Sequence, residues 1–186
     1  MAVLHLVRHG QATAGWDADP DPGLSNLGIQ QAHAVAAQLV ADLTPRALLV
    51  SPLRRTRETA APLGEHWSCA PVVTPEVGEI PSPGSDLGDR GLWLDRALRS
   101  TWTELGDRTV DDWRAGLLAC LRACMQDTVI VTHFVAINAV VGVAEGSDAV
   151  TTFLPANASV TVVSVDRSSG GIHVVARGEQ ADQIVG

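Results

Sequence analysis

The sequence of 186 residues contains no lysine, so all 13 of its basic side chains are arginines. They stand against 21 acidic side chains and give a formal net charge of −8 at pH 7. Proteins that bind nucleic acid or an anionic membrane surface do so through clustered positive charge. We therefore expect neither nucleic acid nor a membrane to be a partner of this chain.

Cysteine is also scarce, with Cys69, Cys120 and Cys124 in no CxxC pair and at no spacing typical of metal ligands. A sparse, odd set of cysteines in a chain of this length is typical of a reducing compartment. The chain has no basic N-terminal region followed by an apolar one, and no apolar run approaches the length of about 18 residues that would suggest a membrane span. These observations predict a cytoplasmic protein and offer no metal site.

Apolar runs and amphipathic segments alternate along the chain. Hydrophobic residues make up 46% and charged residues 18%, as in globular proteins, and the length corresponds to one domain, residues 1–186. The predicted strands span residues 2–7, 47–50, 71–74, 128–132, 158–166 and 172–177, and the predicted helices span residues 25–42, 53–63, 92–104, 110–125 and 135–143. This order, ending in two strands joined by a turn, predicts a three-layer α/β/α fold whose mostly parallel sheet carries an antiparallel edge.

Polar or cationic residues follow three of the predicted strands. The segments are Arg8-His9-Gly10-Gln11, Ser51-Pro52-Leu53-Arg54-Arg55-Thr56 and Thr132-His133-Phe134. Ligands of open α/β sheets bind beyond the carboxyl ends of the strands, where helix N-termini also favour anions. Arginine can pair two phosphate oxygens at once, and histidine can act as a nucleophile or a donor. The sequence therefore predicts a focused anion site, suited to phosphate, in an otherwise acidic protein.

Four ordered segments resemble the sequence blocks of a known family. Residues 6–11, Leu-Val-Arg-His-Gly-Gln, resemble the signature of the histidine phosphatase superfamily, which has the phosphoglycerate-mutase-like fold. Residues 24–32, 51–60 and 129–133 resemble, in order, its second block, its third block and the strand that carries its second catalytic histidine. The resemblance implies a phosphomonoester hydrolase that acts through a phosphohistidine intermediate on a small phosphorylated metabolite or a phosphohistidine protein.

The resemblance also implies roles for individual residues. His9 is the expected nucleophile, which takes up the phosphoryl group and passes it to water. Arg8, Arg55 and His133 are expected to bind the phosphate oxygens and to stabilise charge in the transition state, with Gln11 as a further substrate-binding residue. Because arginine and histidine supply the charge, the resemblance implies no cofactor and no metal.

The family's proton donor lies in a short segment after the third strand. In the segment Val77-Gly78-Glu79-Ile80 the expected donor is Glu79, and Glu76 is the alternative. Residues 81–126, which contain two of the predicted helices, are expected to form a helical insertion that covers the active site.

Departures from the family pattern separate the candidate functions. Gln11 is neutral where the mutases commonly have glutamate, and Ala12 and Gly15 replace their usual Ser or Thr and their usual Asn. These differences disfavour phosphoglycerate mutase, which stays an alternative beside a non-catalytic phosphate-binding pseudoenzyme. Both expected histidines and both expected arginines are present, so we favour the hydrolase. Phe134 stands where the family commonly has glycine, and the backbone approach to phosphate is expected to differ there.

Overall fold

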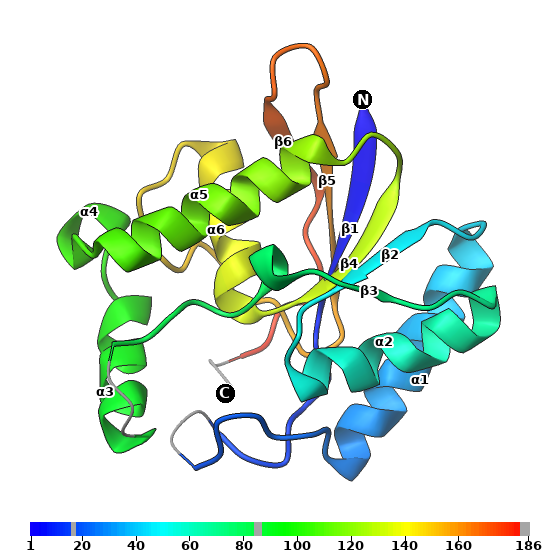
Figure 1. Cartoon of the computed structure of the whole chain (residues 1–186), viewed down its shortest axis with the longest axis horizontal. Helices are drawn as coiled ribbons and strands as arrows, with labels where there is room; N and C mark the ends of the chain where they lie inside the picture. Colours follow the sequence, from blue (N-terminus) through cyan, green and yellow to red (C-terminus); the bar gives the residue numbers. More distant parts are fainter. Residues whose placement is uncertain (16–17, 84–86, 183–186) are drawn as a thin grey trace.

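The computed structural model describes residues 1–15, 18–83 and 87–182 and is built around a six-stranded sheet (Figure 1). The strands are β1 (Ala2–Arg8), β2 (Ala47–Val50), β3 (Val72–Val73), β4 (Thr128–Thr132), β5 (Val160–Val165) and β6 (Ile172–Ala176), in the order β3-β2-β4-β1-β5-β6. Strands β1 to β4 pair in parallel, whereas β5 pairs antiparallel with both β1 and β6. The predicted mostly parallel sheet with an antiparallel edge is confirmed.

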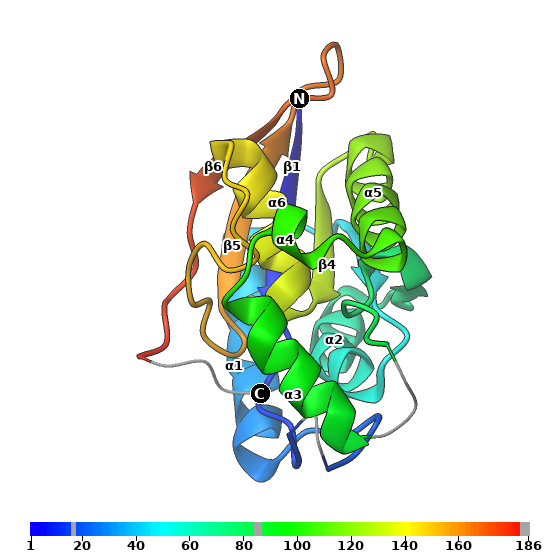
Figure 2. The ribbon, with the colours of Figure 1, turned by 90° about the vertical axis from the view of Figure 1, so that its left-hand side faces the viewer.

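Helices cover both faces of this sheet. They are α1 (Asn26–Asp42), α2 (Arg54–Trp67), α3 (Leu87–Leu98), α4 (Trp102–Leu105), α5 (Arg108–Ala123) and α6 (Phe134–Glu145), and a 3-10 turn, η1, spans Pro75–Val77. The apolar residues of α1 and α2 pack against one face, and those of α5 and α6 pack against the other. Helix α3 belongs to the second group and lies toward the viewer in Figure 2. The three predicted layers are therefore present.

Side-chain alternation along the central strands divides the core into two parts. Leu4, Leu6 and Ile130 join the buried residues of α5 and α6. Val7 and Val129 join those of α1 and α2 on the opposite face. Because helices cover both faces, the central strands are apolar on both sides, which explains why they form continuous apolar runs in the sequence.

The prediction of one helix at residues 92–104 is wrong, because the chain forms two helices there. Helix α3 ends early, and a capping box starts the short helix α4: the Thr101 hydroxyl accepts from the Glu104 N–H, and the Glu104 carboxylate accepts from the Thr101 N–H. This box satisfies two backbone donors that a helix start leaves open. Helix α2 extends beyond its predicted end to Trp67, although Pro62 lies inside it.

Residues 81–126, predicted to be a helical insertion over the active site, contain α3, α4 and α5, and residues 84–86 of this segment lie outside the described residues. The single-domain organisation and the covering role of the segment stay predictions. Within the described ranges, no helix combines the length and the apolar character that crossing a bilayer requires.

Two glycines allow the loop after β1 to approach the start of α1. Ser25 caps this helix through its hydroxyl, which accepts a hydrogen bond from the Gly28 N–H at 3.0 Å. A Cβ atom at Gly28 would lie 2.0 Å from the Gln11 carbonyl oxygen, and one at Gly10 would lie 2.6 Å from the Gly28 oxygen. Both obstacles are backbone atoms, which cannot turn aside as a flexible side chain can. The position of the loop that follows His9 therefore depends on Gly28.

We expect Gly28→Ala to lower the free energy of unfolding by about 1–3 kcal/mol, the usual cost of overpacking, because the Gln11 backbone must move. In a chain of this size each kcal/mol corresponds to roughly 2–4 °C in Tm, which differential scanning calorimetry resolves. Gly116→Ala in α5 is the matched control: nothing lies within 4 Å of a Cβ atom there, so alanine should be neutral or stabilising. Equal Tm values for Gly28→Ala and the wild type would contradict the close approach.

Candidate active site

The carboxyl ends of three parallel strands bring together the residues predicted for the anion site. Arg8 is the last residue of β1, His133 directly follows β4, and Arg55 lies in the first turn of α2, which follows β2. Strands β1 and β2 both pair in parallel with β4, and Arg8 lies opposite Thr132, so the strands end at the same edge. None of the side chains of Arg8, His9, Arg55 and His133 is more than 3% exposed. The structure thus gathers all four into one buried cluster.

Arg55 bridges the two histidines. Its Nε donates to His9 Nε2 at 3.2 Å, and its Nη2 lies 3.3 Å from His133 Nδ1. The two imidazole rings lie edge to face, with their centroids 5.3 Å apart. Burial lowers the pKa of Arg55, and the nearby Glu79 carboxyl opposes this shift. A guanidinium stays protonated at neutral pH in spite of such a shift, so Arg55 carries a full positive charge between the rings.

The hydrogen bonds of His9 define which of its ring nitrogens can attack. Nδ1 lies 2.8 Å from the Gly10 carbonyl oxygen, which can only accept, so Nδ1 carries the proton and Nε2 carries the lone pair. The pKa of His9 lies well below its usual value, first because of burial and then because Arg55 and Arg8 are close. His9 is therefore a neutral imidazole with its lone pair on the nitrogen that faces the arginine.

His133 has a hydroxyl partner on its other side. Ser51 Oγ lies 2.7 Å from His133 Nε2, and Ser51 is fully buried at the end of β2. A hydroxyl can donate or accept, so Ser51 remains a partner in either tautomer, and the histidine can present an Nδ1–H to an anion. Burial, Arg55 and His9 lower the pKa of His133 well below its usual value. Both histidines are thus uncharged near neutral pH.

Two further residues hold the backbone around His9. The Gly10 N–H donates to Thr59 Oγ1 at 3.0 Å, and Asn157 Nδ2 donates to the His9 carbonyl oxygen at 3.1 Å. Thr59, Asn157 and Ser51 have no predicted role from the sequence. Thr59 and Ser51 lie within residues 51–60, the third block, and that position was a signal that could have found them. Asn157 lies in no block.

Glu79, the predicted proton donor, completes the cluster. Its Oε2 lies 3.4 Å from His133 Nδ1 and 3.7 Å from Arg55 Nη2, and its Oε1 accepts from the Ile80 N–H at 3.0 Å. The side chain is 4% exposed, and burial raises the pKa of its carboxyl, although Arg55 opposes the shift. Glu79 therefore holds a proton closer to neutral pH than an ordinary glutamate does. Glu76, the alternative donor, lies in η1 and is exposed.

Two hydrogen bonds hold the segment that carries Glu79. Thr132 Oγ1, at the end of β4, donates to the Val77 carbonyl oxygen at 2.6 Å. Trp113 Nε1, in α5, donates to the Gly78 carbonyl oxygen at 3.3 Å. The carboxyl is thus positioned by the strand that delivers the second histidine and by a helix of the 81–126 segment.

Arg8 and Gln11 lie in different surroundings. Arg8 Nη1 donates to the Pro155 carbonyl oxygen at 2.8 Å, and its guanidinium carbon lies 5.2 Å from the centroid of the Phe134 ring. Burial lowers the pKa of Arg8 to about 10, so it stays protonated at neutral pH. The Gln11 side chain lies at the start of α1, where its Oε1 accepts from the Ser25 hydroxyl at 2.8 Å. Substrate binding by Gln11 stays a prediction.

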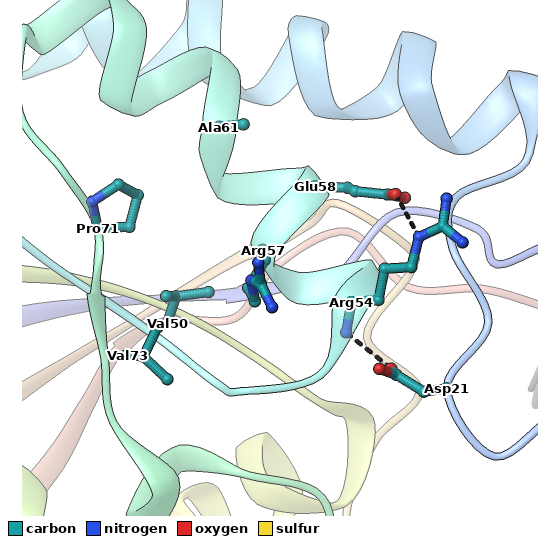
Figure 3. A pocket seen from close by; sticks show the side chains of 8 residues that line it. All are labelled: Asp21, Val50, Arg54, Arg57, Glu58, Ala61, Pro71 and Val73. Carbon is teal, nitrogen blue, oxygen red and sulfur yellow. Dashed lines mark hydrogen bonds and ion pairs between the residues drawn. The ribbon is translucent and has the colours of Figure 1, made fainter.

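Arg54 and Arg57, which flank Arg55 in the sequence, line a separate cavity (Figure 3). This cavity of about 640 Å³ is lined by Asp21, Val50, Arg54, Arg57, Glu58, Ala61, Pro71 and Val73. Arg54 is paired within it, because its Nε donates to Glu58 at 2.7 Å and its backbone N–H donates to Asp21 at 2.7 Å. The lining includes neither histidine of the buried cluster, so this cavity is not the predicted phosphate site.

The arrangement as a whole provides the parts for phosphoryl transfer. A neutral imidazole with a lone pair can attack phosphorus, two guanidinium groups can hold its oxygens, and a carboxyl that keeps its proton can assist a leaving group. Among the described residues, no group of three or more histidine, cysteine, aspartate or glutamate side chains is placed to hold a metal ion. The charges that act on the histidines come from Arg8, Arg55 and Glu79, and Arg90 adds to them at His133.

Comparison with known protein sequences agrees with this geometry. Residues 4–84 match the family model of the histidine phosphatase superfamily (branch 1). A 5''-phosphoribostamycin phosphatase of Niallia circulans is 33% identical over 116 residues, which cover 55% of this chain and 54% of that protein. A PE-PGRS family protein of Mycobacterium tuberculosis is 42% identical over 83 residues, which cover 42% of this chain and 14% of that protein. The chain therefore spans only about half, or less, of the length of these relatives.

Solved structures with the same fold cover nearly the whole chain. A mycobacterial glucosyl-3-phosphoglycerate phosphatase matches with a TM-score of 0.75 at 23% identity, over 97% of this chain and 100% of that one. A phosphoserine phosphatase from Entamoeba histolytica matches with a TM-score of 0.71 at 19% identity, over 97% and 98% of the two chains. At these identities the likeness shows the fold, which is phosphoglycerate-mutase-like. Residues 4–84 thus carry the sequence pattern of the histidine phosphatase superfamily, and the chain as a whole has the fold of these solved structures.

Proposed function

We propose that this protein is a phosphomonoester hydrolase that acts through a phosphohistidine intermediate at His9, on a small phosphorylated metabolite or a phosphohistidine protein. The observation that carries the proposal is the neutral His9 ring, whose Nε2 lone pair faces a buried cation. Binding of phosphate needs cations but no nucleophile, so this placement of His9 favours turnover over binding alone.

In the first step the Nε2 lone pair of His9 attacks phosphorus, so that a P–N bond forms and the bond from phosphorus to the ester oxygen breaks. Arg8, Arg55 and His133 bind the other phosphate oxygens and stabilise the charge that develops on them. Glu79 gives its proton to the departing oxygen, so the product leaves as an alcohol rather than as an alkoxide.

In the second step water attacks the phosphorus of the phosphohistidine. The carboxylate that remains at Glu79 accepts a proton from this water, the P–N bond breaks, and its electron pair returns to His9 Nε2. Inorganic phosphate leaves, and the proton on Glu79 is ready for the next ester. Because the guanidinium groups of Arg8 and Arg55 supply the positive charge throughout, we propose that turnover needs no added metal.

The names of similar proteins support a small phosphate ester as the substrate. One relative is named a 5''-phosphoribostamycin phosphatase, and two solved structures are named as glucosyl-3-phosphoglycerate and phosphoserine phosphatases. Each name denotes a small phosphorylated molecule, which favours a metabolite over a phosphohistidine protein.

The three cysteines are free, which supports our further proposal of a reducing location, the cytoplasm.

We expect the purified protein to hydrolyse p-nitrophenyl phosphate in the presence of excess EDTA, because the arginines carry the charge that a metal supplies elsewhere. A labelled phosphate donor should give an acid-labile, base-stable adduct, as a P–N bond does. His9→Ala should abolish both signals, whereas His173→Ala, at an exposed position of β6, should retain both. Activity that EDTA removes and a divalent metal restores, or labelling that survives in His9→Ala, would overturn the proposal.

The same measurements separate the two alternatives. A pseudoenzyme would bind phosphate or vanadate without any turnover by the wild-type protein. A phosphoglycerate mutase would move the label between hydroxyl groups of phosphoglycerate instead of releasing inorganic phosphate.

A second prediction concerns the two-point contact of Arg55. Its N–H groups reach both histidines, at 3.2 and 3.3 Å, and a lysine ammonium cannot span both positions. We expect Arg55→Lys to weaken competitive inhibition by orthovanadate by about 10- to 100-fold, the worth of one hydrogen bond to a charged group. Arg57→Lys, which changes an exposed arginine of the same helix, is the matched control and should leave the inhibition constant unchanged. An unchanged inhibition constant in Arg55→Lys would show that a single positive charge at this position is enough to bind vanadate, and that the two-point contact is not needed.

A third prediction concerns Glu79 as the general acid. Glu79→Gln should slow the hydrolysis of alkyl phosphates by about 10²- to 10⁴-fold, and that of activated aryl phosphates far less, because aryl leaving groups need little protonation. Burial raises the pKa of Glu79, and its proton is present below that pKa and lost above it. The kcat/KM for alkyl phosphates should therefore fall as pH rises through this pKa, and Glu79→Gln should lack the fall.

Glu76→Gln is the control for this prediction, because the residue is nearby in sequence but exposed. If Glu79→Gln slows both substrate types equally, or neither of them, another group is the proton donor, and a selective loss in Glu76→Gln would identify it.

A further inference from the structure

Among the described residues, Pro155 and Phe134, from segments that follow β4, both contact Arg8. Its Nη1 donates to the Pro155 carbonyl oxygen at 2.8 Å. Its guanidinium carbon lies over the Phe134 ring, 5.2 Å from the ring centroid, and both side chains are 1% exposed. One contact is a hydrogen bond that holds one nitrogen, and the other covers the cation with an aromatic face.

The two groups that hold Arg8 are themselves tied together. Phe134 is the first residue of α6, where side chains tilt toward the helix start and so toward the strand ends. Asn138 Nδ2 donates to the Phe134 carbonyl oxygen at 3.0 Å. Its Oδ1 accepts from the N–H groups of Thr152 and Phe153, at 2.7 and 3.0 Å. The start of α6 and the segment that leads to Pro155 therefore form one support.

An aromatic face suits a buried phosphate-binding arginine better than a carboxylate does. The ring attracts a cation, most strongly where water is excluded, as it is at these two side chains. A carboxylate in the same place would also hold the guanidinium, but it would cancel the positive charge that phosphate needs. The ring holds the cation and leaves its charge available.

We propose that Phe134 is a positioning residue for Arg8: together with the Pro155 carbonyl, its ring holds the guanidinium in one place, ready for the transferred phosphoryl group. The inference rests on the proposed function and extends it to the residue that departs from the family's usual glycine. Phe134 touches Arg8 and acts on the phosphoryl group only through it.

The first experiment changes the electron density of the ring and keeps its shape. Phenylalanines with one, two or five ring fluorines, inserted at position 134, make the face progressively less attractive to a cation. Titration calorimetry with orthovanadate should show a stepwise loss of affinity, reaching roughly 5- to 30-fold with five fluorines, the range for a desolvated cation–π contact. Because the volume hardly changes, these variants should fold as the wild type does, which their Tm values check.

Phe153 is a matched control within the same chain. It is the second of the two phenylalanines, it is buried, and its ring lies 5.2 Å from the guanidinium carbon of Arg177. The same fluorinated series at position 153 should leave the vanadate affinity unchanged. Equal losses at the two positions, or no loss at position 134, would overturn the inference.

A double-mutant cycle tests whether Phe134 acts through Arg8. Phe134→Leu should weaken vanadate binding and raise KM in the wild-type background, but it should cost nothing more in Arg8→Ala. It should also leave the pH profile that reports on Glu79 where it is. A full additional loss in Arg8→Ala would assign Phe134 a general packing role.

The wild-type measurements separate the two levels of the proposal. If the wild type binds neither phosphate nor orthovanadate, the proposed function fails, and the role of Phe134 fails with it. If the wild type binds orthovanadate and hydrolyses phosphate esters, but the fluorinated variants at position 134 all keep the wild-type affinity, the proposed phosphatase function is retained. Only the inference about Phe134 is then wrong.

Discussion

The positive charge of Arg55 is buried between two imidazole rings and a carboxyl, and it acts on the pKa of all three groups, second only to burial itself. It adds to burial in lowering the pKa of His9 and of His133, and it is the largest effect that opposes the raised pKa of Glu79. A guanidinium removed from water requires compensating contacts. Arg55 obtains them from the same three side chains, at 3.2 to 3.7 Å, so Arg55, His9, His133 and Glu79 form one connected buried cluster.

The sheet provides the rigid frame for this cluster. Four of its members come from the carboxyl ends of β1, β4 and β2, the three central parallel strands, whose positions are determined by core packing on both faces. The fifth, Glu79, is attached to the same frame through Thr132 at the end of β4. The close approach of Gly10 and Gly28 then determines the path of the chain directly after His9.

Local sequence patterns predict the parts of this structure that local physics decides. The runs at 47–50 and 128–132 predict their strands with the observed bounds, because a strand that is covered on both faces reads as a nearly continuous apolar run. The helix prediction at 92–104 is wrong because a Thr-x-x-Glu capping box interrupts it, although that box can be read from the sequence.

The supporting contacts of the site are harder to predict, since they join distant positions. Ser51 and His133 are 82 residues apart, and Asn157 and His9 are 148 apart. The motifs around His9, Arg55 and His133 indicate the reacting groups without these partners. Phe134 is visible in the sequence only as a departure from a family pattern, because its partner Arg8 lies in the first strand, far from it along the chain. Side-chain chemistry could therefore be predicted, but the contacts that orient it required the fold.

The hydrogen bond from Arg55 Nε to His9 Nε2 has a consequence for selectivity. In the proposed mechanism the lone pair of His9 Nε2 attacks phosphorus, and it accepts this hydrogen bond until another acceptor takes the Arg55 N–H. A phosphate dianion can do so, because a guanidinium binds it more strongly than it binds a neutral imidazole. A neutral electrophile offers no comparable acceptor and finds the nucleophile still covered. Under the proposed mechanism, Arg55 would therefore favour anionic substrates, because only an anion that binds the guanidinium frees His9 Nε2 to attack.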